Sequence, residues 1–115
     1  VDGAHAHGGE AYVVCEMSHP GALTFLTGAN AEKMAGMAKA AGADGIIAPA
    51  TRPERTAVLR EIIGNDMKIC SPGVGAQGAQ PEDVKKYVAG IIVGRAIYEA
   101  EDVKAAAHAY KLRCI

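Results

Sequence analysis

Four short, largely apolar runs alternate with helix-like segments along this chain, and that alternation limits the possible fold more than any other feature. The runs are residues 11–17, 45–48, 67–71 and 90–93. None shows the strict apolar–polar alternation of a half-exposed strand, and continuous apolar runs are typical of parallel strands buried on both faces. The alternation of such strands with helices predicts an α/β fold with a parallel sheet.

Helix signals fill the intervals between the runs. We expect helices over residues 30–41, from Pro53 to about residue 63, from Pro81 onward, and over residues 102–112. Asn30 is a suitable N-cap, Pro53 suits a first turn, and a glycine follows the first two helices. The residues expected to form their apolar sides are Met34, Met37, Ala38 and Ala41 in the first helix, and Val58, Leu59, Ile62 and Ile63 in the second.

A weak internal repeat relates residues 44–49 to residues 89–94, which fits stacked βα units, although any buried parallel strand gives a similar pattern. Four βα units are half of a (β/α)8 TIM barrel, which typically needs ~250 residues. We therefore expect residues 1–115 to be a single segment with no separate second domain. Because a half-barrel leaves two strand edges unpaired, we expect it to pair with a missing half, with another copy of itself, or with both.

The composition argues against several classes of protein. The net charge of −1 gives no basic footprint for nucleic acid, and no apolar run approaches the ~20 residues that span a bilayer. Three widely spaced cysteines without a CxxC favour a reducing, cytoplasmic setting. His5 and His7 could suggest a metal, but no neighbouring ligand completes a set, so we expect no metal site and no cofactor.

Two glycine motifs follow the last two predicted strands. Residues 71–78 read Ser-Pro-Gly-Val-Gly-Ala-Gln-Gly, and residues 91–95 read Ile-Ile-Val-Gly-Arg. Glycine lets backbone N–H groups approach an anion closely, Gln77 can donate a hydrogen bond, and the guanidinium of Arg95 matches phosphate oxygens. Loops after the last two strands of a β/α barrel commonly bind phosphate, so these motifs predict a phosphate site.

Four motifs together resemble one family. Residues 16–22, 49–55, 71–78 and 91–98 occur in the order and approximate spacing of orotidine 5'-monophosphate decarboxylases of the archaeal type. The resemblance extends roughly from residue 12 to residue 107. It implies that the four predicted strands are strands five to eight of the barrel, so that this chain is the carboxyl-terminal half.

The resemblance also implies a role for each matching position. Ser18 would bond to the pyrimidine edge, and Pro72 and Val74 would line the pyrimidine pocket. Gln77 would reach the phosphate from a closing loop, and Gly94 and Arg95 would hold its other oxygens. Arg52 would brace that loop when it is closed. The remaining loop positions in the implied substrate site are Gly73, Gly75, Ala76 and Gly78.

The family's catalytic Asp-x-Lys-x-x-Asp array does not occur in this sequence. The two Asp-x-Lys pairs that begin at Asp83 and Asp102 lack the second carboxylate and fall on expected outer helices. The resemblance thus implies a metal-free lyase that converts orotidine 5'-monophosphate to uridine 5'-monophosphate and CO2 as part of a complete, dimeric barrel. It implies no catalytic residue in this chain, which alone would be inactive.

Two alternatives stay open. The chain could act as a self-associating half-barrel that binds phosphate compounds without catalysis, or it could belong to a related sugar-phosphate decarboxylase or synthase that uses a metal. Other charged side chains have a simpler interpretation: we expect Glu54, Arg55, Arg60 and Glu61 to be ordinary exposed helix charges.

Overall fold

The computed structural model describes residues 1–114, and its centre is a four-stranded parallel sheet. The strands are β1 (Tyr12–Val14), β2 (Gly45–Ile47), β3 (Lys68–Pro72) and β4 (Gly90–Ile92). They pair in chain order, β1-β2-β3-β4, and every pair is parallel. The predicted α/β class and the parallel sheet are therefore confirmed, although each strand is shorter than or offset from its predicted run.

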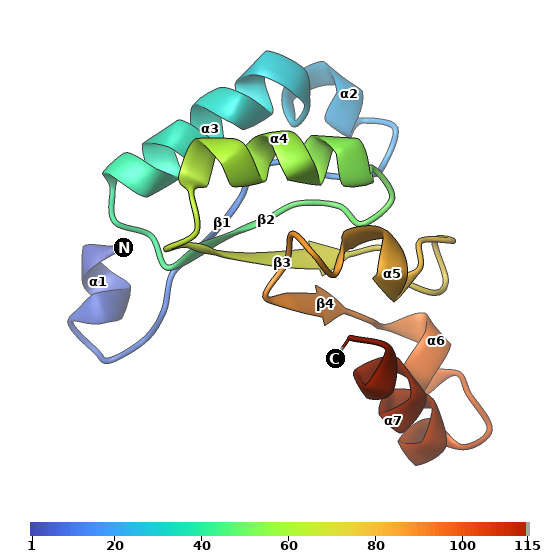
Figure 1. The fold of residues 1–115 in the computed structure, drawn as a ribbon. Helices are drawn as coiled ribbons and strands as arrows, with labels where there is room; N and C mark the ends of the chain where they lie inside the picture. Colours follow the sequence, from blue (N-terminus) through green and yellow to red (C-terminus); the bar gives the residue numbers. More distant parts are fainter. Residues whose placement is uncertain (115) are drawn as a thin grey trace.

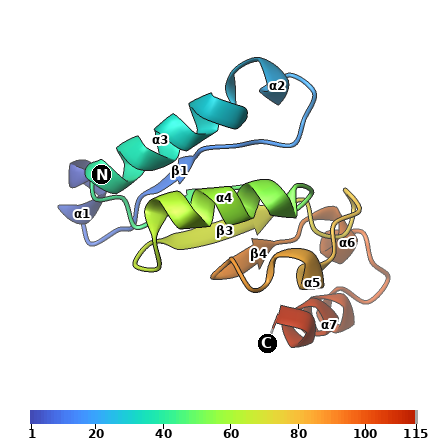
Figure 2. The same cartoon turned by 45° about the horizontal axis from the view of Figure 1, so that its top comes forward.

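Helices connect the strands in the manner of successive βα units. The helices are α1 (Asp2–His5), α2 (Ala22–Phe25), α3 (Gly28–Ala40), α4 (Pro53–Ile63), α5 (Pro81–Val84), α6 (Arg95–Tyr98) and α7 (Val103–Cys114). Figure 1 shows α3 and α4 side by side over one face of the sheet, with α5, α6 and α7 gathered beyond β4. The same grouping is visible after rotation in Figure 2. No helix within residues 1–114 is long and apolar enough to cross a membrane.

The two faces of the sheet differ in burial. Register places Val13, Ile46 and Ile69 in one row, and the last two are fully buried beneath the helices. On the opposite face, Val14 is 40% exposed and Ile92 is 48% exposed. Apolar strand residues are seldom left half in water when both sheet faces are covered. Residues 1–114 thus cover one face of the sheet and leave the other partly open.

The buried apolar side chains form two clusters. The larger one packs α3 and α4 on β1 to β3, with Leu59 and Ile63 fully buried on the side of α4 where we expected them. The smaller one lies beneath the segment that follows β3 and includes Val74, Ala79, Val84 and part of Tyr110. The second cluster therefore anchors the glycine-rich segment by burying two of its side chains, Val74 and Ala79.

Two predicted helix features are wrong. Helix α3 begins after Thr27, not at Asn30, because Thr27 is extended and the chain is already helical from Gly28. Its buried side is made of Ala31, Ala35 and Ala38. Of the expected stripe, Ala38 is buried and Met34 is half-buried, whereas Met37 is 61% exposed and Ala41 is exposed. Small side chains face inward because α3 packs against both α4 and the strands.

The helix expected from Pro81 is a short turn of four residues. Its start is well defined, since the Asp83 carboxylate accepts the backbone N–H of Gln80 at 2.9 Å in a capping box. The last helix begins at Val103, where the Asp102 carboxylate accepts the N–H of Ala105 at 2.8 Å. Both Asp residues of the Asp-x-Lys pairs therefore serve as helix caps.

Candidate functional site

The segments that follow β3 and β4 share one hollow of about 230 Å³ at the carboxyl end of the sheet. Carboxyl ends of neighbouring parallel strands lie at the same edge, which brings together residues more than fifteen positions apart. The residues that line the hollow are Pro72, Gly73, Val74, Ala76, Gln77, Ile92, Gly94, Arg95 and Tyr98. Gln77 and Arg95 thus line one common hollow, and their binding of phosphate stays a prediction.

Backbone geometry explains the glycines of the segment after β3. Gly73 and Gly75 have φ of +100° and +84°, a region that side chains rarely adopt. A Cβ on Gly73 would lie 3.1 Å from Thr51 Cγ2, and one on Gly75 would lie 2.6 Å from Ala96 Cβ. We call residues 73–80 the glycine loop. Any other residue at position 73 or 75 would strain the backbone of this loop and would crowd Thr51 or Ala96.

The glycine loop is closed at its neck and exposed at its tip. The N–H of Gly75 donates to the carbonyl of Ala79 at 2.9 Å, and Val74 forms a parallel bridge with Ala79. Ala76, Gln77 and Gly78, the tip between these contacts, are exposed. The exposed side chain of Gln77 is one of those that line the hollow.

A third strand end joins the site through Ser18, which follows β1. The Ser18 hydroxyl donates to Oε1 of Gln77 at 2.8 Å. Ser18 is half-buried and does not line the hollow itself. The segments after β1, β3 and β4 are thus connected, and the residues predicted to bind substrate lie in one region. Arg52, which was predicted to brace the loop, makes different contacts.

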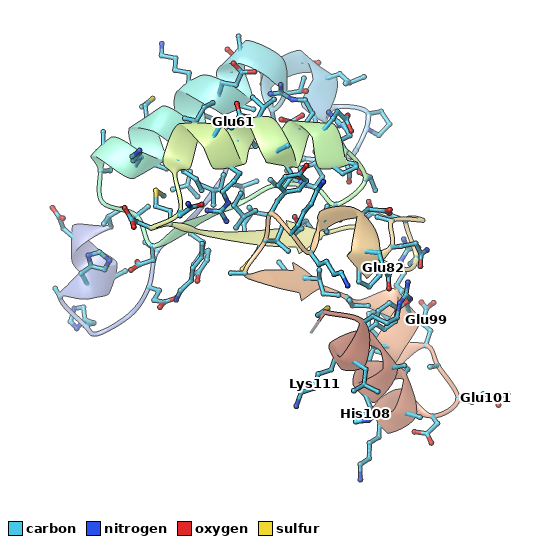
Figure 3. All side chains as sticks on the ribbon, viewed as in Figure 1. Glu61, Glu82, Glu99, Glu101, His108 and Lys111 are labelled. Atoms are coloured by element: carbon cyan, nitrogen blue, oxygen red, sulfur yellow. The ribbon has the colours of Figure 1, made fainter. Side chains whose placement is uncertain are left out.

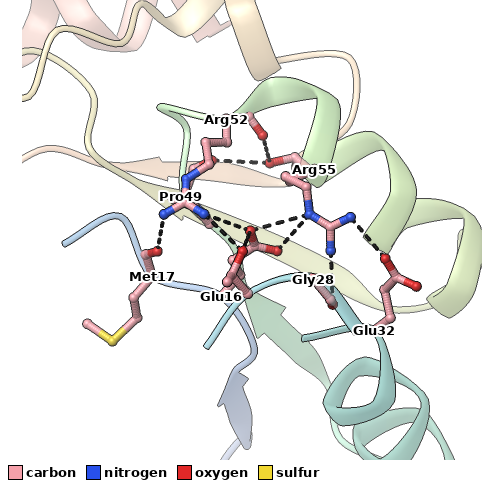
Figure 4. A network of polar contacts seen from close by, with 9 residues as sticks. Glu16, Met17, Gly28, Glu32, Pro49, Arg52 and Arg55 are labelled. Carbon is pink, nitrogen blue, oxygen red and sulfur yellow. Dashed lines mark hydrogen bonds and ion pairs between the residues drawn. The ribbon is translucent and has the colours of Figure 1, made fainter. Parts of the chain in front are cut away.

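Arg52 lies at the start of α4 and contacts the segment after β1 rather than the glycine loop. Its guanidinium donates to Glu16 Oε1 at 3.0 Å, to Thr27 Oγ1 at 3.1 Å and to the carbonyl of Met17 at 2.7 Å. Figure 4 shows the Arg52 guanidinium between the Met17 carbonyl and the Glu16 carboxylate. Arg52 therefore holds the residue that immediately precedes Ser18.

A buried carboxylate shortly after β1 is the feature near the site that sequence reasoning missed. Glu16 is fully buried, and Arg55 donates to its Oε2 at 3.1 Å while also bonding to Glu32 at 2.9 Å (Figure 4). The interpretation of Arg55 as an ordinary exposed charge is wrong. The available signal was a glutamate inside an apolar strand run, because a buried carboxylate requires cationic partners.

Arg60 was also interpreted wrongly. Its guanidinium donates to the backbone carbonyls of Tyr87, Gly64 and Met67 at distances of 2.7 to 2.9 Å. Burial lowers the pKa of this guanidinium. Arg60 thus ties the end of α4 to the chain entering β3 and β4, at the end of the sheet away from the hollow.

Within residues 1–114, the His and Cys side chains do not form a metal site. Nε2 of His5 lies 2.8 Å from the Asp44 carboxylate, and within residues 1–114 no three His, Cys, Asp or Glu side chains gather as a metal site. Burial raises the pKa of the Cys15 thiol to about 11, which makes it a poor nucleophile near neutral pH.

A parallel β/α sheet with glycine loops around a common hollow at its strand ends is the arrangement of β/α barrel proteins. The model of the orotidine 5'-phosphate decarboxylase / HUMPS family matches residues 1–110. The chain therefore belongs to this family, as its motifs predicted.

Individual relatives agree with the family assignment. The chain is 53% identical over 108 residues to the orotidine 5'-phosphate decarboxylase of Methanosarcina mazei, covering 93% of this chain and 49% of that protein. It is 47% identical to the Pyrococcus furiosus protein of the same name, covering 86% of this chain and 47% of that protein. The chain thus spans about half the length of these curated relatives.

Solved structures of the same family share the fold. A crystal structure of orotidine 5'-monophosphate decarboxylase from Methanocaldococcus jannaschii, complexed with inhibitor BMP, matches 98% of this chain and 53% of that chain, with a TM-score of 0.90 and 41% identity. The Pyrococcus horikoshii OT3 orotidine 5'-phosphate decarboxylase matches 95% of this chain and 52% of that chain, with a TM-score of 0.83.

Proposed function

We propose that this chain is the substrate-binding half of an orotidine 5'-phosphate decarboxylase and holds the nucleotide by its phosphate and its pyrimidine. The observation that carries the proposal is that Gln77, Gly94 and Arg95 line one hollow, with Gln77 bonded to Ser18. Phosphate oxygens would accept hydrogen bonds from the Gln77 amide, the Gly94 N–H and the Arg95 guanidinium. Such an arrangement suits the dianionic end of a nucleotide.

The pyrimidine would lie toward β1. Ser18 has a hydroxyl that both donates and accepts, so it can bond to the ring edge and to Gln77 at the same time. Pro72 and Val74 would form the apolar wall of the pyrimidine pocket. The backbone of the other loop residues would complete the site, namely Gly73, Gly75, Ala76 and Gly78.

Binding of the phosphate would contribute to catalysis even though the phosphate lies away from the reacting carbon. The phosphate does not react, so its binding energy can drive closure of the glycine loop and exclusion of water from the reacting carbon. Arg52 would support this closure by fixing the Met17–Ser18 segment, against which Gln77 is held.

The decarboxylation itself would depend on groups outside this chain. The sequence has no Asp-x-Lys-x-x-Asp array, and we propose that the chain supplies strands five to eight of the barrel. The half-exposed sheet face with Val14 and Ile92 supports closure by the remaining strands, either from an amino-terminal half or within a dimer.

Calorimetric titration of the full-length protein tests the proposal. We expect uridine 5'-monophosphate to bind more tightly than ribose 5-phosphate, because only the nucleotide fills the pyrimidine pocket. Arg95→Ala should weaken nucleotide binding roughly 10- to 100-fold, since a charge-assisted hydrogen bond contributes about 1.5–3 kcal/mol. Equal affinity for both ligands would instead favour a related sugar-phosphate enzyme.

A matched control for this titration is Lys111→Ala. Lys111 is exposed on α7 and makes no contact with the hollow. Its removal should leave nucleotide affinity unchanged, so that a general loss of positive charge can be separated from the loss of Arg95.

A further inference from the structure

Helix α7 packs beneath the glycine loop near the start of the loop. A Cβ on Gly75 would lie only 2.6 Å from Oη of Tyr110, so the phenol ring of α7 lies directly against the loop backbone. Tyr110 is also packed against the smaller apolar cluster that contains Val74 and Ala79. The neck of the loop therefore rests on a side chain of α7.

The same helix contacts the chain where the glycine loop ends. Arg113 donates from Nη2 to the side-chain oxygen of Gln80 at 2.7 Å, and from Nε and Nη2 to the Glu82 carboxylate at 2.9 and 2.6 Å. Gln80 is the last loop residue, and Glu82 lies in the first turn of α5. The paired bonds to Glu82 fix the direction of the guanidinium as well as its distance.

Tyr110 and Arg113 act on opposite ends of the loop but belong to one surface of α7. The guanidinium carbon of Arg113 lies 5.8 Å from the centre of the Tyr110 ring. Figure 3 shows Glu82 on the side of α5 that faces α7, whereas Lys111 and His108 point away from the rest of the molecule. One face of α7 thus contacts the loop, and another is solvated.

These contacts support both ends of the loop, whereas the tip is held by the hydrogen bond from Ser18 to Gln77. The neck is closed by the bond from Gly75 to Ala79, and the far end is fixed by the Gln80–Asp83 capping box. Between them lies Gln77, whose side chain reaches the hollow. A movement of α7 would therefore shift the loop backbone on both sides of Gln77 and so change the position of the Gln77 side chain.

We propose that Tyr110 and Arg113 are positioning residues that hold the glycine loop in register with the Gly94–Arg95 segment, so that Gln77 and Arg95 meet the same phosphate. Helix α7 is suited to this role because it follows α6, which begins at Arg95. This inference rests on the proposed function, since it concerns the phosphate held by that site.

The expected effects are moderate and differ between the two residues. The side chains of Arg113 and Glu82 are 39% and 48% exposed, and an exposed ion pair is worth at most about a fivefold change in an equilibrium constant. Arg113→Ala should therefore weaken phosphate-dependent binding about three- to fivefold. Tyr110→Ala removes a side chain that packs against the loop, and it should weaken phosphate-dependent binding about tenfold.

The test compares uridine 5'-monophosphate with uridine in titrations of the full-length protein. The ratio of their affinities isolates the contribution of the phosphate. We expect Arg113→Ala and Tyr110→Ala to lower this ratio while the affinity for uridine stays the same. Lys111→Ala, on the solvated face of the same helix, should leave both unchanged.

Charge reversal supplies a second readout that a general loss of stability does not produce. Arg113→Glu and Glu82→Arg should each lower the affinity ratio, and the double variant should recover most of the loss. Gln80 is compatible with both orientations because its amide can accept or donate.

The outcomes separate this inference from the proposed function. A wild-type protein that binds nucleotide and nucleoside equally would refute the phosphate site itself. A wild-type preference for the nucleotide that survives intact in Arg113→Ala and Tyr110→Ala would refute the role of α7 alone. Equal losses for both ligands would also count against it, since they indicate general unfolding.

Discussion

The hydroxyl of Ser18 donates a hydrogen bond of 2.8 Å to Oε1 of Gln77, although 59 residues separate them in the chain. Ser18 follows β1 at the edge of the sheet, whereas Gln77 is at the tip of the glycine loop after β3. The bond therefore joins the proposed pyrimidine side of the site to its proposed phosphate side.

This bond predicts that Ser18 and Gln77 act as a unit. Ser18→Ala and Gln77→Ala should each weaken uridine 5'-monophosphate binding, and the double variant should lose less than the sum of the two. We expect a coupling of about 0.5–1.5 kcal/mol, which is typical of one hydrogen bond. A double-mutant cycle by calorimetry measures it, and strict additivity would show that the two side chains act independently.

The buried carboxylate of Glu16 should be important for stability. Glu16→Gln keeps the shape but leaves Arg52 and Arg55 without their shared anion, and loss of one partner of a buried ion pair costs about 3–5 kcal/mol. Because the two arginines keep some contact with water, we expect the free energy of unfolding to fall by about 3 kcal/mol, the lower end of this range. Urea unfolding measures this change.

Glu61→Gln is the control for that measurement. Glu61 is exposed on α4, the helix that also carries Arg55. Its substitution should change the unfolding free energy by less than about 0.5 kcal/mol. A Glu16→Gln protein as stable as this control would mean that the network contributes little.

Two glycines of the loop offer a matched comparison. Gly75 and Gly78 both have positive φ, +84° and +93°, but only Gly75 is crowded, whereas a Cβ on Gly78 meets nothing within 4 Å. Gly78→Ala should cost about 1–2 kcal/mol from backbone strain alone. Gly75→Ala should cost more because Tyr110 and Ala96 must also move. Equal unfolding free energies for the two variants would contradict the close packing.

Cysteine labelling should distinguish the buried thiol of Cys15 from the exposed thiol of Cys114. The pKa of Cys15 is raised to about 11 by burial, so at pH 8 about one Cys15 thiol in a thousand is ionised. Cys114 is exposed. We expect iodoacetamide to modify Cys114 first and Cys15 only after unfolding, as followed by mass spectrometry. Rapid labelling of native Cys15 would show that β1 is open to solvent.

The sequence predicted the elements whose signals are local. Apolar runs marked the four strands, Pro53 and Gly64 bounded α4, and the glycines of residues 71–78 marked a loop where φ is positive. These features depend on backbone preferences of single residues, so they can be read without knowing the neighbours.

The features that sequence reasoning missed depend on distant partners. Arg55 and Arg60 lie on one helix with ordinary charge spacing, yet one bonds to a carboxylate after β1 and the other to carbonyls near β3 and β4. The inward alanines of α3 were overlooked because Met34 and Met37 are more apolar, while close packing with α4 favours the smaller side chains. Such choices are decided by tertiary contacts.

The most direct test of the account is a crystal structure of the full-length protein with uridine 5'-monophosphate bound. The account predicts that the phosphate lies in the hollow between the two glycine segments, within hydrogen-bond distance of the Gln77 amide, the Gly94 N–H and the Arg95 guanidinium. A nucleotide bound elsewhere, or a phosphate in that hollow with Arg95 turned into solvent, would contradict it.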